Sequence, residues 1–329
     1  MKEVVVGIDI GGTYTKYGIV DRNGNCLFEN SICTNSKNGV EGFLVDLSNS
    51  LKNDISLQNG INLKGIGIGA PNGNYYNGTI EFAPNLKWKG IIPFVELFKK
   101  YFNYPAVLTN DANAAAIGEK LYGGAKNMND FIVITLGTGL GSGIVSNGEL
   151  IYGHDGFAGE IGHTIVRHNG RECGCGRKGC LETYVSASGI KRTIYKLLAD
   201  SLDDSQLRGV SFNELSAEMI TEAAKQGDKI AIEAFKYTGS LLGQKLADSV
   251  AHTSPEAIFL LGGLAKAGDL ILKPTRQHLE MNLLNIYKNK VKVLLSGLTE
   301  TNAAVLGAGA LAWKELEKQM SNSSDISKK

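Results

Sequence analysis

Apolar residues recur with two different periods in the first hundred positions of the chain. A continuous apolar run from Val4 to Ile10 predicts a buried strand, and the looser alternation from Thr15 to Val20 predicts a second strand that forms a hairpin with it. The other predicted elements of this part are two helices at residues 41–53 and Phe94–Tyr101, and two buried strands at Gly65–Gly69 and Ala106–Thr109. Strands therefore alternate with helices from the start.

A second strand–glycine turn–strand pattern follows further along the chain. The run Phe131–Leu136 enters the glycine-rich turn 137–143 and leaves through Ile144–Val145, which resembles the first hairpin and indicates a weak internal repeat. The other predicted elements are helices from Asn110 to about Leu121, from an Asp228 cap to about Val250 and from about Ala303 to Glu317, strands at Ala257–Leu261 and Val291–Leu295, and a polar, disordered tail at 321–329.

These elements predict an α/β protein made of two related halves with a cleft between them. We place the boundary near Asn110. The last helix is expected to return to the first half, because apolar Leu306, Leu311 and Trp313 need a surface to pack against. The predicted domains are a smaller one of residues 1–109 plus about 300–320 and a larger one of residues 110–299.

Composition narrows the class of protein. The chain has 329 residues, of which 43% are hydrophobic and 20% charged, as is typical of a globular protein with room for two domains. The net charge is +1 and the basic residues are scattered, which argues against a nucleic-acid partner. No apolar run is long enough to cross a bilayer, and no apolar signal region follows Met1. We therefore expect a cytoplasmic protein.

Four possible metal ligands are clustered near the middle of the chain. They are His163, Cys173, Cys175 and Cys180, and the glycines between them allow sharp reversals of the backbone. Three thiolates and one imidazole at this spacing match a closed tetrahedral zinc site, which has a structural role because it leaves no ligand position for water. A disulfide with a spare thiol, or an iron–sulfur cluster, is the alternative. Glu160 and Glu182 bracket the cluster.

Two glycine turns are candidates for phosphate binding. In Asp9–Thr13 the backbone N–H groups of Gly11 and Gly12 can form an anion-binding concavity. Asp9 could hold Mg²⁺, while Thr13 and Lys16 could reach phosphate oxygens. An ordinary hairpin turn is the alternative, and the sequence has no Walker-type phosphate loop. The second turn, Thr135–Gly139, adds Gly137, Thr138 and Gly139 to the candidate phosphate-binding residues. The pair Gly262 and Gly263, at the end of a buried strand, leaves room for an adenine ring.

The pair Asn110–Asp111 precedes an alanine-rich helix. The simplest interpretation is a helix cap. A cap can also present the Asp111 carboxylate at the positive end of the helix, where it stays ionised and can act as a base.

Together these segments resemble the ROK family of sugar kinases and sugar-responsive repressors, within the actin-like ATPase superfamily. The resemblance covers about residues 4–310. The segments that carry it are Asp9-Ile-Gly-Gly-Thr13, Asn110-Asp111-Ala-Asn-Ala, Leu136-Gly-Thr-Gly139, Gly159-Glu-Ile-Gly-His163 and the cysteine element 173–182. It implies a two-domain hexokinase/RNase H-like fold and an ATP-dependent hexose kinase, most similar to the bacterial glucokinases of the family.

The resemblance also implies roles for individual residues. Asp111 would be the base that takes the proton of the sugar 6-hydroxyl, with ATP, Mg²⁺ and a structural Zn²⁺ as the other components. The residues implied to hold the sugar are Asn85, Asn110, Asp111, Glu160, His163 and Glu182. Where many relatives have Ala-Pro-Gly, this chain has Asn72 between Pro71 and Gly73. Asn tolerates a left-handed backbone, so the turn can survive.

Three alternatives stay open. The sugar could be N-acetylmannosamine, N-acetylglucosamine or fructose, or the protein could bind sugar without turnover. A repressor of the family would need a DNA-binding module of roughly 60–80 residues ahead of the sugar domain. Asp9 follows Met1 by only eight positions, so we expect none. An actin-like ATPase that activates a partner through an iron–sulfur site is disfavoured by the histidine ligand. The family implies a homodimer or homotetramer.

Overall fold

A computed structural model describes residues 1–35, 39–298 and 303–326. The chain divides into two compact units, which we describe separately. Unit 1 comprises Met1–Asn127, Leu150–Ala158 and Gly297–Lys329, and unit 2 comprises Met128–Glu149 and Gly159–Ser296. Within the described ranges, no helix has both the length and the apolar character needed to cross a membrane.

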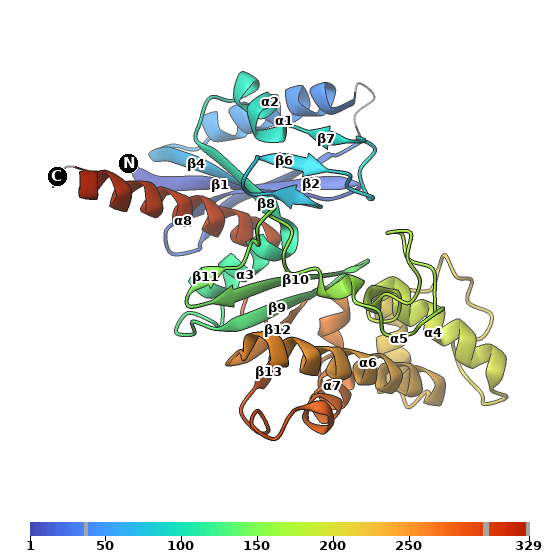
Figure 1. The fold of residues 1–329 in the computed structure, drawn as a ribbon. Helices are drawn as coiled ribbons and strands as arrows, with labels where there is room; N and C mark the ends of the chain where they lie inside the picture. Colours follow the sequence, from blue (N-terminus) through green and yellow to red (C-terminus); the bar gives the residue numbers. More distant parts are fainter. Residues whose placement is uncertain (36–38, 299–302, 327–329) are drawn as a thin grey trace. The chain divides into compact units, whose positions relative to one another are not determined.

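Unit 1 is built on a five-stranded sheet with the order β3-β2-β1-β4-β8 (Figure 1). Strand β1 pairs antiparallel with β2 and parallel with β4, and β4 pairs parallel with β8. A small sheet of order β5-β6-β7 accompanies it. The elements are β1 (Lys2–Ile10), β2 (Tyr14–Asp21), β3 (Cys26–Cys33), α1 (Gly39–Ser56), β4 (Ile61–Ala70), β5 (Gly73–Asn74), β6 (Thr79–Glu81), β7 (Ile91–Ile92), α2 (Phe94–Tyr101), β8 (Ala106–Asn110), α3 (Asp111–Leu121) and α8 (Ala303–Ile326).

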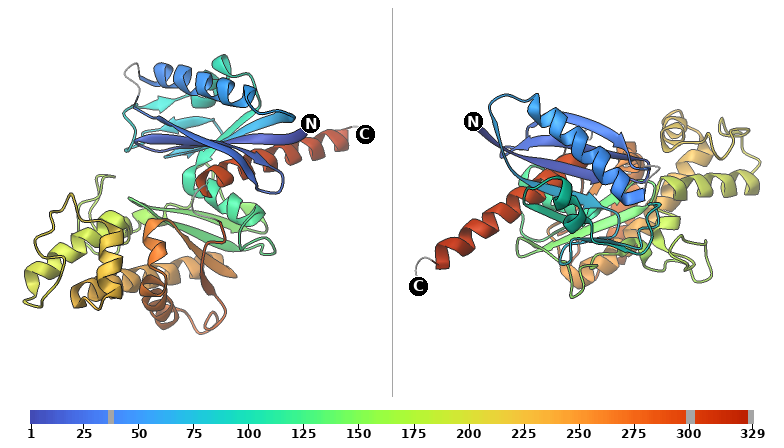
Figure 2. Two further views of the ribbon diagram at one scale, coloured as in Figure 1. Left: turned by 180° about the vertical axis from the view of Figure 1, so that it is seen from behind. Right: turned by 90° about the horizontal axis from the view of Figure 1, so that it is seen from above.

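The two faces of the unit 1 sheet are covered differently. Alternate residues of β1 point to opposite faces, so Val4, Val6 and Ile8 pack under α1 and α2, while Val5 packs with α8. On the α8 side, Gly7 and Gly67 carry no side chain, and a Cβ on Gly67 would lie 1.8 Å from the carbonyl oxygen of Ala308. The helix therefore lies directly on the sheet, as Figure 2 shows from behind.

Unit 2 repeats the same strand pattern. Its sheet has the order β11-β10-β9-β12-β13, in which β9 pairs antiparallel with β10 and parallel with β12. This confirms the internal repeat predicted from the two glycine-turned hairpins. The elements are β9 (Phe131–Leu136), β10 (Leu140–Ser146), β11 (Glu149–Leu150), η1 (Ile161–His163), η2 (Leu181–Thr183), α4 (Ala187–Asp200), α5 (Ala217–Lys225), α6 (Lys229–Thr253), β12 (Ala257–Leu261), η3 (Gly263–Ala267), α7 (Asp269–Asn282) and β13 (Lys292–Leu295).

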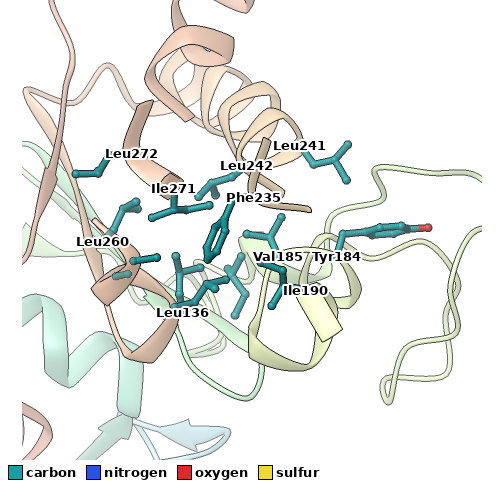
Figure 3. Close-up of a cluster of buried hydrophobic side chains, with 14 of the residues drawn as sticks. Leu136, Tyr184, Val185, Ile190, Phe235, Leu241, Leu242, Leu260, Ile271 and Leu272 are labelled. Atoms are coloured by element: carbon teal, nitrogen blue, oxygen red, sulfur yellow. The ribbon is translucent and has the colours of Figure 1, made fainter. Parts of the chain in front are cut away.

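The core of unit 2 lies between this sheet and its helices. Figure 3 shows Phe235 of α6 among side chains of β9, β12 and α7, including Leu136, Leu260 and Ile271. Asp228 caps α6 as predicted, because its side chain accepts a hydrogen bond from the backbone N–H of Ala231 at 3.1 Å. The rigid core holds the ends of β9 and β12, where the second set of candidate residues lies.

Two expectations about the chain's organisation differ from the structure. Helix α3 packs on α8 and β4, so it belongs to unit 1, and the boundary lies at Asn127 rather than near Asn110. Helix α8 continues to Ile326 through most of the segment predicted to be a disordered tail. Ser321 fits the helix because its hydroxyl donates to the carbonyl oxygen of Lys318 at 2.9 Å. Residues 327–329 lie outside the described ranges. The expected return of the last helix to the first half is confirmed.

Candidate functional site

Two predicted acidic residues meet at the carboxyl ends of three parallel strands in unit 1. Asp9 of β1 is in register with Gly69 of β4, and Gly69 with Thr109 of β8. A Cβ on Gly69 would lie 3.5 Å from the Cα of Asp111 and 3.8 Å from Oδ1 of Asp9. Gly69 therefore lies beside both the Asp9 carboxylate and the backbone of Asp111, at the edge where open α/β sheets bind ligands.

The surroundings of both carboxylates favour their protonated forms. Burial raises the pKa of Asp9 to about 7, the charge of Asp111 adds to this, and Lys16 on the paired strand β2 opposes it. Asp111 is accessible to solvent, yet the surrounding protein displaces enough water to raise its pKa, against a backbone hydrogen bond from Ala112. A raised pKa brings a carboxylate closer to the value at which a general base works best.

Asn110 and Asp111 begin α3 together. Asn110 is the N-cap, and its Oδ1 accepts from the backbone N–H of Ala112 at 2.8 Å. Oδ1 of Asp111 accepts from the same N–H at 2.8 Å. The capping role is thus confirmed, and Asp111 stands in the first turn of the helix, where the backbone N–H groups partly offset the effect of burial on its charge.

The glycine turn after β1 packs against another predicted residue. A Cβ on Gly12 would lie 2.8 Å from the backbone oxygen of Asn85, so the absence of a side chain allows this contact. Gly11 donates its N–H to the carbonyl oxygen of Tyr14 at 3.1 Å, which closes the turn. Thr13 and Asn85 are both exposed. The structure therefore brings Asn85 beside the turn that follows Asp9.

Asn72 occupies a left-handed turn, with φ at +51°. Its side-chain amide donates to the carbonyl oxygen of Glu81 at 3.0 Å, and Glu81 donates its backbone N–H to the carbonyl oxygen of Asn72 at 3.1 Å. The expectation that asparagine preserves this turn is confirmed.

A separate cavity of about 420 Å³ lies in unit 1 between the β5–β6 hairpin and the segment 150–158. Asn74 ties the two together, since its amide donates to the carbonyl oxygen of Asp155 at 2.9 Å. None of the predicted site residues lines this cavity. The candidate site of unit 1 is therefore at the strand ends and not in this cavity.

In unit 2, the second glycine turn lies against Glu182. A Cβ on Gly139 would lie 2.5 Å from Oε2 of Glu182, and that oxygen accepts from the backbone N–H of Leu140 at 3.3 Å. Gly137 has no described atom within 4 Å of its Cβ position, so the turn is open on that side. Thr138 is anchored through its carbonyl oxygen, which accepts from the Ser188 hydroxyl at 2.8 Å.

The four predicted metal ligands of unit 2 converge. The ligand atoms of His163, Cys173, Cys175 and Cys180 all lie within 4.8 Å of one another. The sulfurs of Cys175 and Cys180 are 3.6 Å apart, and Cys173 Sγ is 3.7 Å from Nδ1 of His163. A tetrahedral zinc site with bonds near 2.3 Å has edges of about 3.8 Å, so the cluster is compatible with a structural zinc ion.

The chemistry of the thiols agrees with this arrangement. All five cysteines of the chain are free thiols, so the alternative of a disulfide is not what the structure holds. Burial raises the pKa of Cys173 and Cys180. Burial acts in the same direction at Cys175, but hydrogen bonds from the backbone and side chain of Arg177 outweigh it and lower the pKa to about 6. Cys175 can therefore supply a thiolate at neutral pH.

His163 faces two different groups with its two ring nitrogens. Nδ1 points to the thiols and lies 3.9 Å from Oε1 of Glu182, while Nε2 lies 3.8 Å from Oε2 of Glu160. Oε1 of Glu182 also accepts from the Cys173 thiol at 3.1 Å. The two glutamates that bracket the cysteine element in sequence thus also bracket the histidine in space.

Two residues that hold this region in place were not predicted from the sequence. The Ser142 hydroxyl of β10 donates to the carbonyl oxygen of Gly159 and accepts from the backbone N–H of Ile161, so it fixes the Gly159–His163 segment. Arg171 donates to the carbonyl oxygens of Thr183 and Gly189 at 2.8 and 2.9 Å and stacks on Tyr184. A polar residue within a buried strand was the only available signal for Ser142, and for Arg171 there was none.

The other glycine pair follows β12. Gly262 has a φ of +104°, and a Cβ there would lie 2.7 Å from the carbonyl oxygen of Leu136, so glycine is required. Gly263 begins η3 and is exposed. The predicted residues of unit 2 thus form one group around the metal cluster and the turn after β9, and a second group at the end of β12.

Comparison with known proteins adds to this geometry. The sequence model described as the ROK family matches residues 5–315. The chain belongs to the ROK family. Among its ROK relatives, the glucokinase of Halalkalibacterium halodurans is 35% identical, and the match covers 97% of this chain and 96% of the relative. The crystal structure of a ROK family glucokinase from Streptomyces griseus in complex with glucose and AMPPNP superposes with a TM-score of 0.82 at 32% identity, covering 94% of this chain and 99% of that one.

The ROK family also contains regulators. The xylose repressor of Caldicellulosiruptor bescii is 31% identical over 95% of this chain, but the match covers 78% of the repressor. The predicted fold class is confirmed, because the neighbouring ROK sugar kinase structures have the actin-like ATPase fold. Fold and family alone therefore leave the function to be argued from the site residues.

Proposed function

We propose that this protein is an ATP-dependent glucokinase, which transfers the terminal phosphoryl group of ATP to the 6-hydroxyl of glucose. The broader class, an ATP-dependent sugar kinase, is supported by relatives and solved structures that match along almost their whole length. The observation that carries the proposal is the pair of acidic residues, Asp9 and Asp111, which lie beside Gly69 and influence each other's charge. Phosphoryl transfer needs a base for the attacking hydroxyl and charge stabilisation for the phosphates, and this pair can supply both.

Asp111 is the proposed base. Its position in the first turn of α3 fixes the carboxylate, and its raised pKa makes it a better proton acceptor than an ordinary aspartate. Asn110 and Asn85 would position the sugar from the same unit. Glu160, His163 and Glu182 would hold the remaining hydroxyls, with charge-assisted hydrogen bonds of about 1.5–3 kcal/mol each.

We propose that Asp9 binds Mg²⁺, directly or through water, and the ion would neutralise charge on the phosphates. The residues fit such an ion, because burial and the charge of Asp111 raise the pKa of Asp9, and a bound cation would offset both effects. Gly12 and Thr13, and likewise Thr138 and Gly139, would offer backbone N–H groups for phosphate oxygens, whereas the N–H groups of Gly11 and Gly137 close the two turns. Gly262 and Gly263 would border the adenine.

A structural zinc ion is proposed for His163, Cys173, Cys175 and Cys180. The ion would fix the loop that carries Glu182 and would orient His163 so that its other nitrogen faces the sugar. Free thiols and an ATP substrate suit a reducing cytoplasm, which is where we propose that the enzyme acts. The homodimer or homotetramer implied by the family stays a prediction.

The test is a sugar panel with two readouts. ADP release reports any kinase reaction, and coupling to glucose-6-phosphate dehydrogenase reports glucose 6-phosphate alone. We expect both signals with glucose, and loss of both in Asp111→Asn. If ADP is released only with N-acetylmannosamine, N-acetylglucosamine or fructose, the protein is still an ATP-dependent sugar kinase, but glucose is not its substrate. Sugar binding by calorimetry without ADP release from any sugar would identify a binding protein instead.

A further inference from the structure

The end of β12 is bordered by an acidic side chain that the proposed mechanism does not use. Among the described residues, the one atom within 4 Å of a Cβ position on Gly263 is Oε1 of Glu218, at 4.0 Å. Both residues are exposed. The open space beside Gly263 is thus limited on one side by a carboxylate that solvent or a ligand can reach.

Glu218 is held in a defined position. It lies in the first turn of α5, whose N-cap Ser216 accepts from the backbone N–H of Met219 at 3.2 Å. Helix α5 contacts η3, the segment that begins at Gly263. Hydrogen bonds from its own backbone N–H and from Ser216 lower the pKa of Glu218, and the charge of Lys266 on η3 acts in the same direction. The side chain is therefore an ionised acceptor at neutral pH.

We infer that Glu218 recognises the ribose of the nucleotide by accepting hydrogen bonds from its 2′- and 3′-hydroxyls. The inference rests on the proposed function, which places the adenosine beside Gly262 and Gly263. A carboxylate has two oxygens and about four acceptor sites, so it can take both hydroxyls of a vicinal diol while keeping its bonds to α5. An acidic side chain on the ribose diol is the same solution that dinucleotide-binding enzymes use on another fold.

The neighbouring acid on the same helix serves as a matched control. Glu222 lies one turn further along α5, and its carboxylate is paired with Lys225 at 2.7 Å. It has the same charge as Glu218 and also lies on α5, but it does not border Gly263. A general effect of removing one negative charge from α5 would therefore appear equally in both variants.

The test compares Glu218→Gln with Glu222→Gln, using ATP and 2′-deoxyATP at saturating glucose. The wild type is expected to have a KM for 2′-deoxyATP about tenfold above that for ATP, the size of one lost charge-assisted hydrogen bond. In Glu218→Gln the KM for ATP should rise and the ratio should fall below about threefold, whereas Glu222→Gln should keep the wild-type ratio. Unfolding temperature checks that both variants are folded.

A wild-type ratio near one, or an unchanged ratio in Glu218→Gln, would overturn the inference. The affinities for ADP and 2′-deoxyADP, measured by calorimetry, separate failure of the Glu218 inference from failure of the glucokinase proposal, because binding can be measured without sugar turnover. If no sugar is phosphorylated but Glu218 still governs the preference for ADP, the inference stands and the glucokinase proposal falls. If glucose is phosphorylated and the preference for ADP does not depend on Glu218, the glucokinase proposal stands and the inference falls. If ADP does not bind at all, both fail.

Discussion

Replacing Asp9 with asparagine should stabilise unit 1 at high pH while it removes activity. The pKa of Asp9 in the folded protein is raised from 3.8 to about 7, mainly by burial. The folded state therefore disfavours the ionised carboxylate. This penalty is absent below about pH 3, where the group is protonated in both states, grows as pH rises from about 4 towards 7, and is complete above it. Asparagine has nearly the same shape and carries no charge, so it avoids the penalty.

The size of the effect follows from the shift. A difference of about three pKa units corresponds to about 4 kcal/mol at 1.36 kcal/mol per unit, which is an upper limit. Asp9 keeps partial contact with solvent, so we expect about 1–2 kcal/mol at pH 8. That should raise the unfolding temperature by roughly 3–6 °C at pH 8 and leave it nearly unchanged at pH 3.

Intrinsic fluorescence can follow unit 1 alone. The chain has two tryptophans, Trp88 and Trp313, and both lie in unit 1. Thermal unfolding would be recorded in EDTA without ATP, so that no cation compensates the carboxylate. Asp46→Asn, on the exposed side of α1, is the matched control for changing an aspartate to an asparagine in unit 1. If Asp9→Asn changes stability equally at both pH values, or lowers it at pH 8, the reasoning about this carboxylate is refuted.

Three further predictions test the other parts of the site. Asp111→Asn should keep glucose affinity and lower kcat on the order of 10²–10⁴-fold, which is the usual contribution of a general base. If its kcat is instead close to that of the control variant Asp46→Asn, Asp111 is not the catalytic base. Purified protein should contain about one zinc per chain by elemental analysis. Cys175→Ser should lose metal and glucose affinity together, whereas Cys33→Ser should lose neither; full activity without metal would exclude a role for the proposed zinc site. Asn72→Gly should be tolerated, while Asn72→Ala should cost about 1 kcal/mol of unfolding free energy in chemical denaturation, because φ is +51°; equal stability of the two variants would contradict this.

Much of the fold was predictable because the decisive patterns are local. Strand β12 and helix α2 were predicted with the bounds that the structure has, since each is an apolar run or a helical repeat between clear breaks. Helix α3 begins at Asp111, directly after its predicted cap. The metal cluster was predictable for the same reason, since all four ligands lie within eighteen positions of the chain.

The features that were missed depend on contacts rather than on local pattern. Strand β3 pairs with β2 at the edge of the sheet, and most of its side chains are exposed or only partly buried, so no apolar alternation marks it. The boundary between the units was placed too early because the alanines of α3 do not reveal what they pack against. Gly118 shows the reason, since a Cβ there would lie 2.8 Å from the Cα of Gly307 in α8. No local rule predicts that contact.

The position of Glu182 connects two features that the sequence presented as separate. Its Oε1 accepts from the Cys173 thiol in the metal cluster, and its Oε2 accepts from Leu140, directly after the glycine turn. Because Gly139 has no side chain, the Glu182 carboxylate can pack against the turn, within 2.5 Å of the Cβ position. A shift of the cysteine loop would therefore move a carboxylate that is packed against the proposed phosphate-binding turn. The proposed structural metal would in this way be connected to the proposed catalytic site, although none of its ligand positions would be open to substrate.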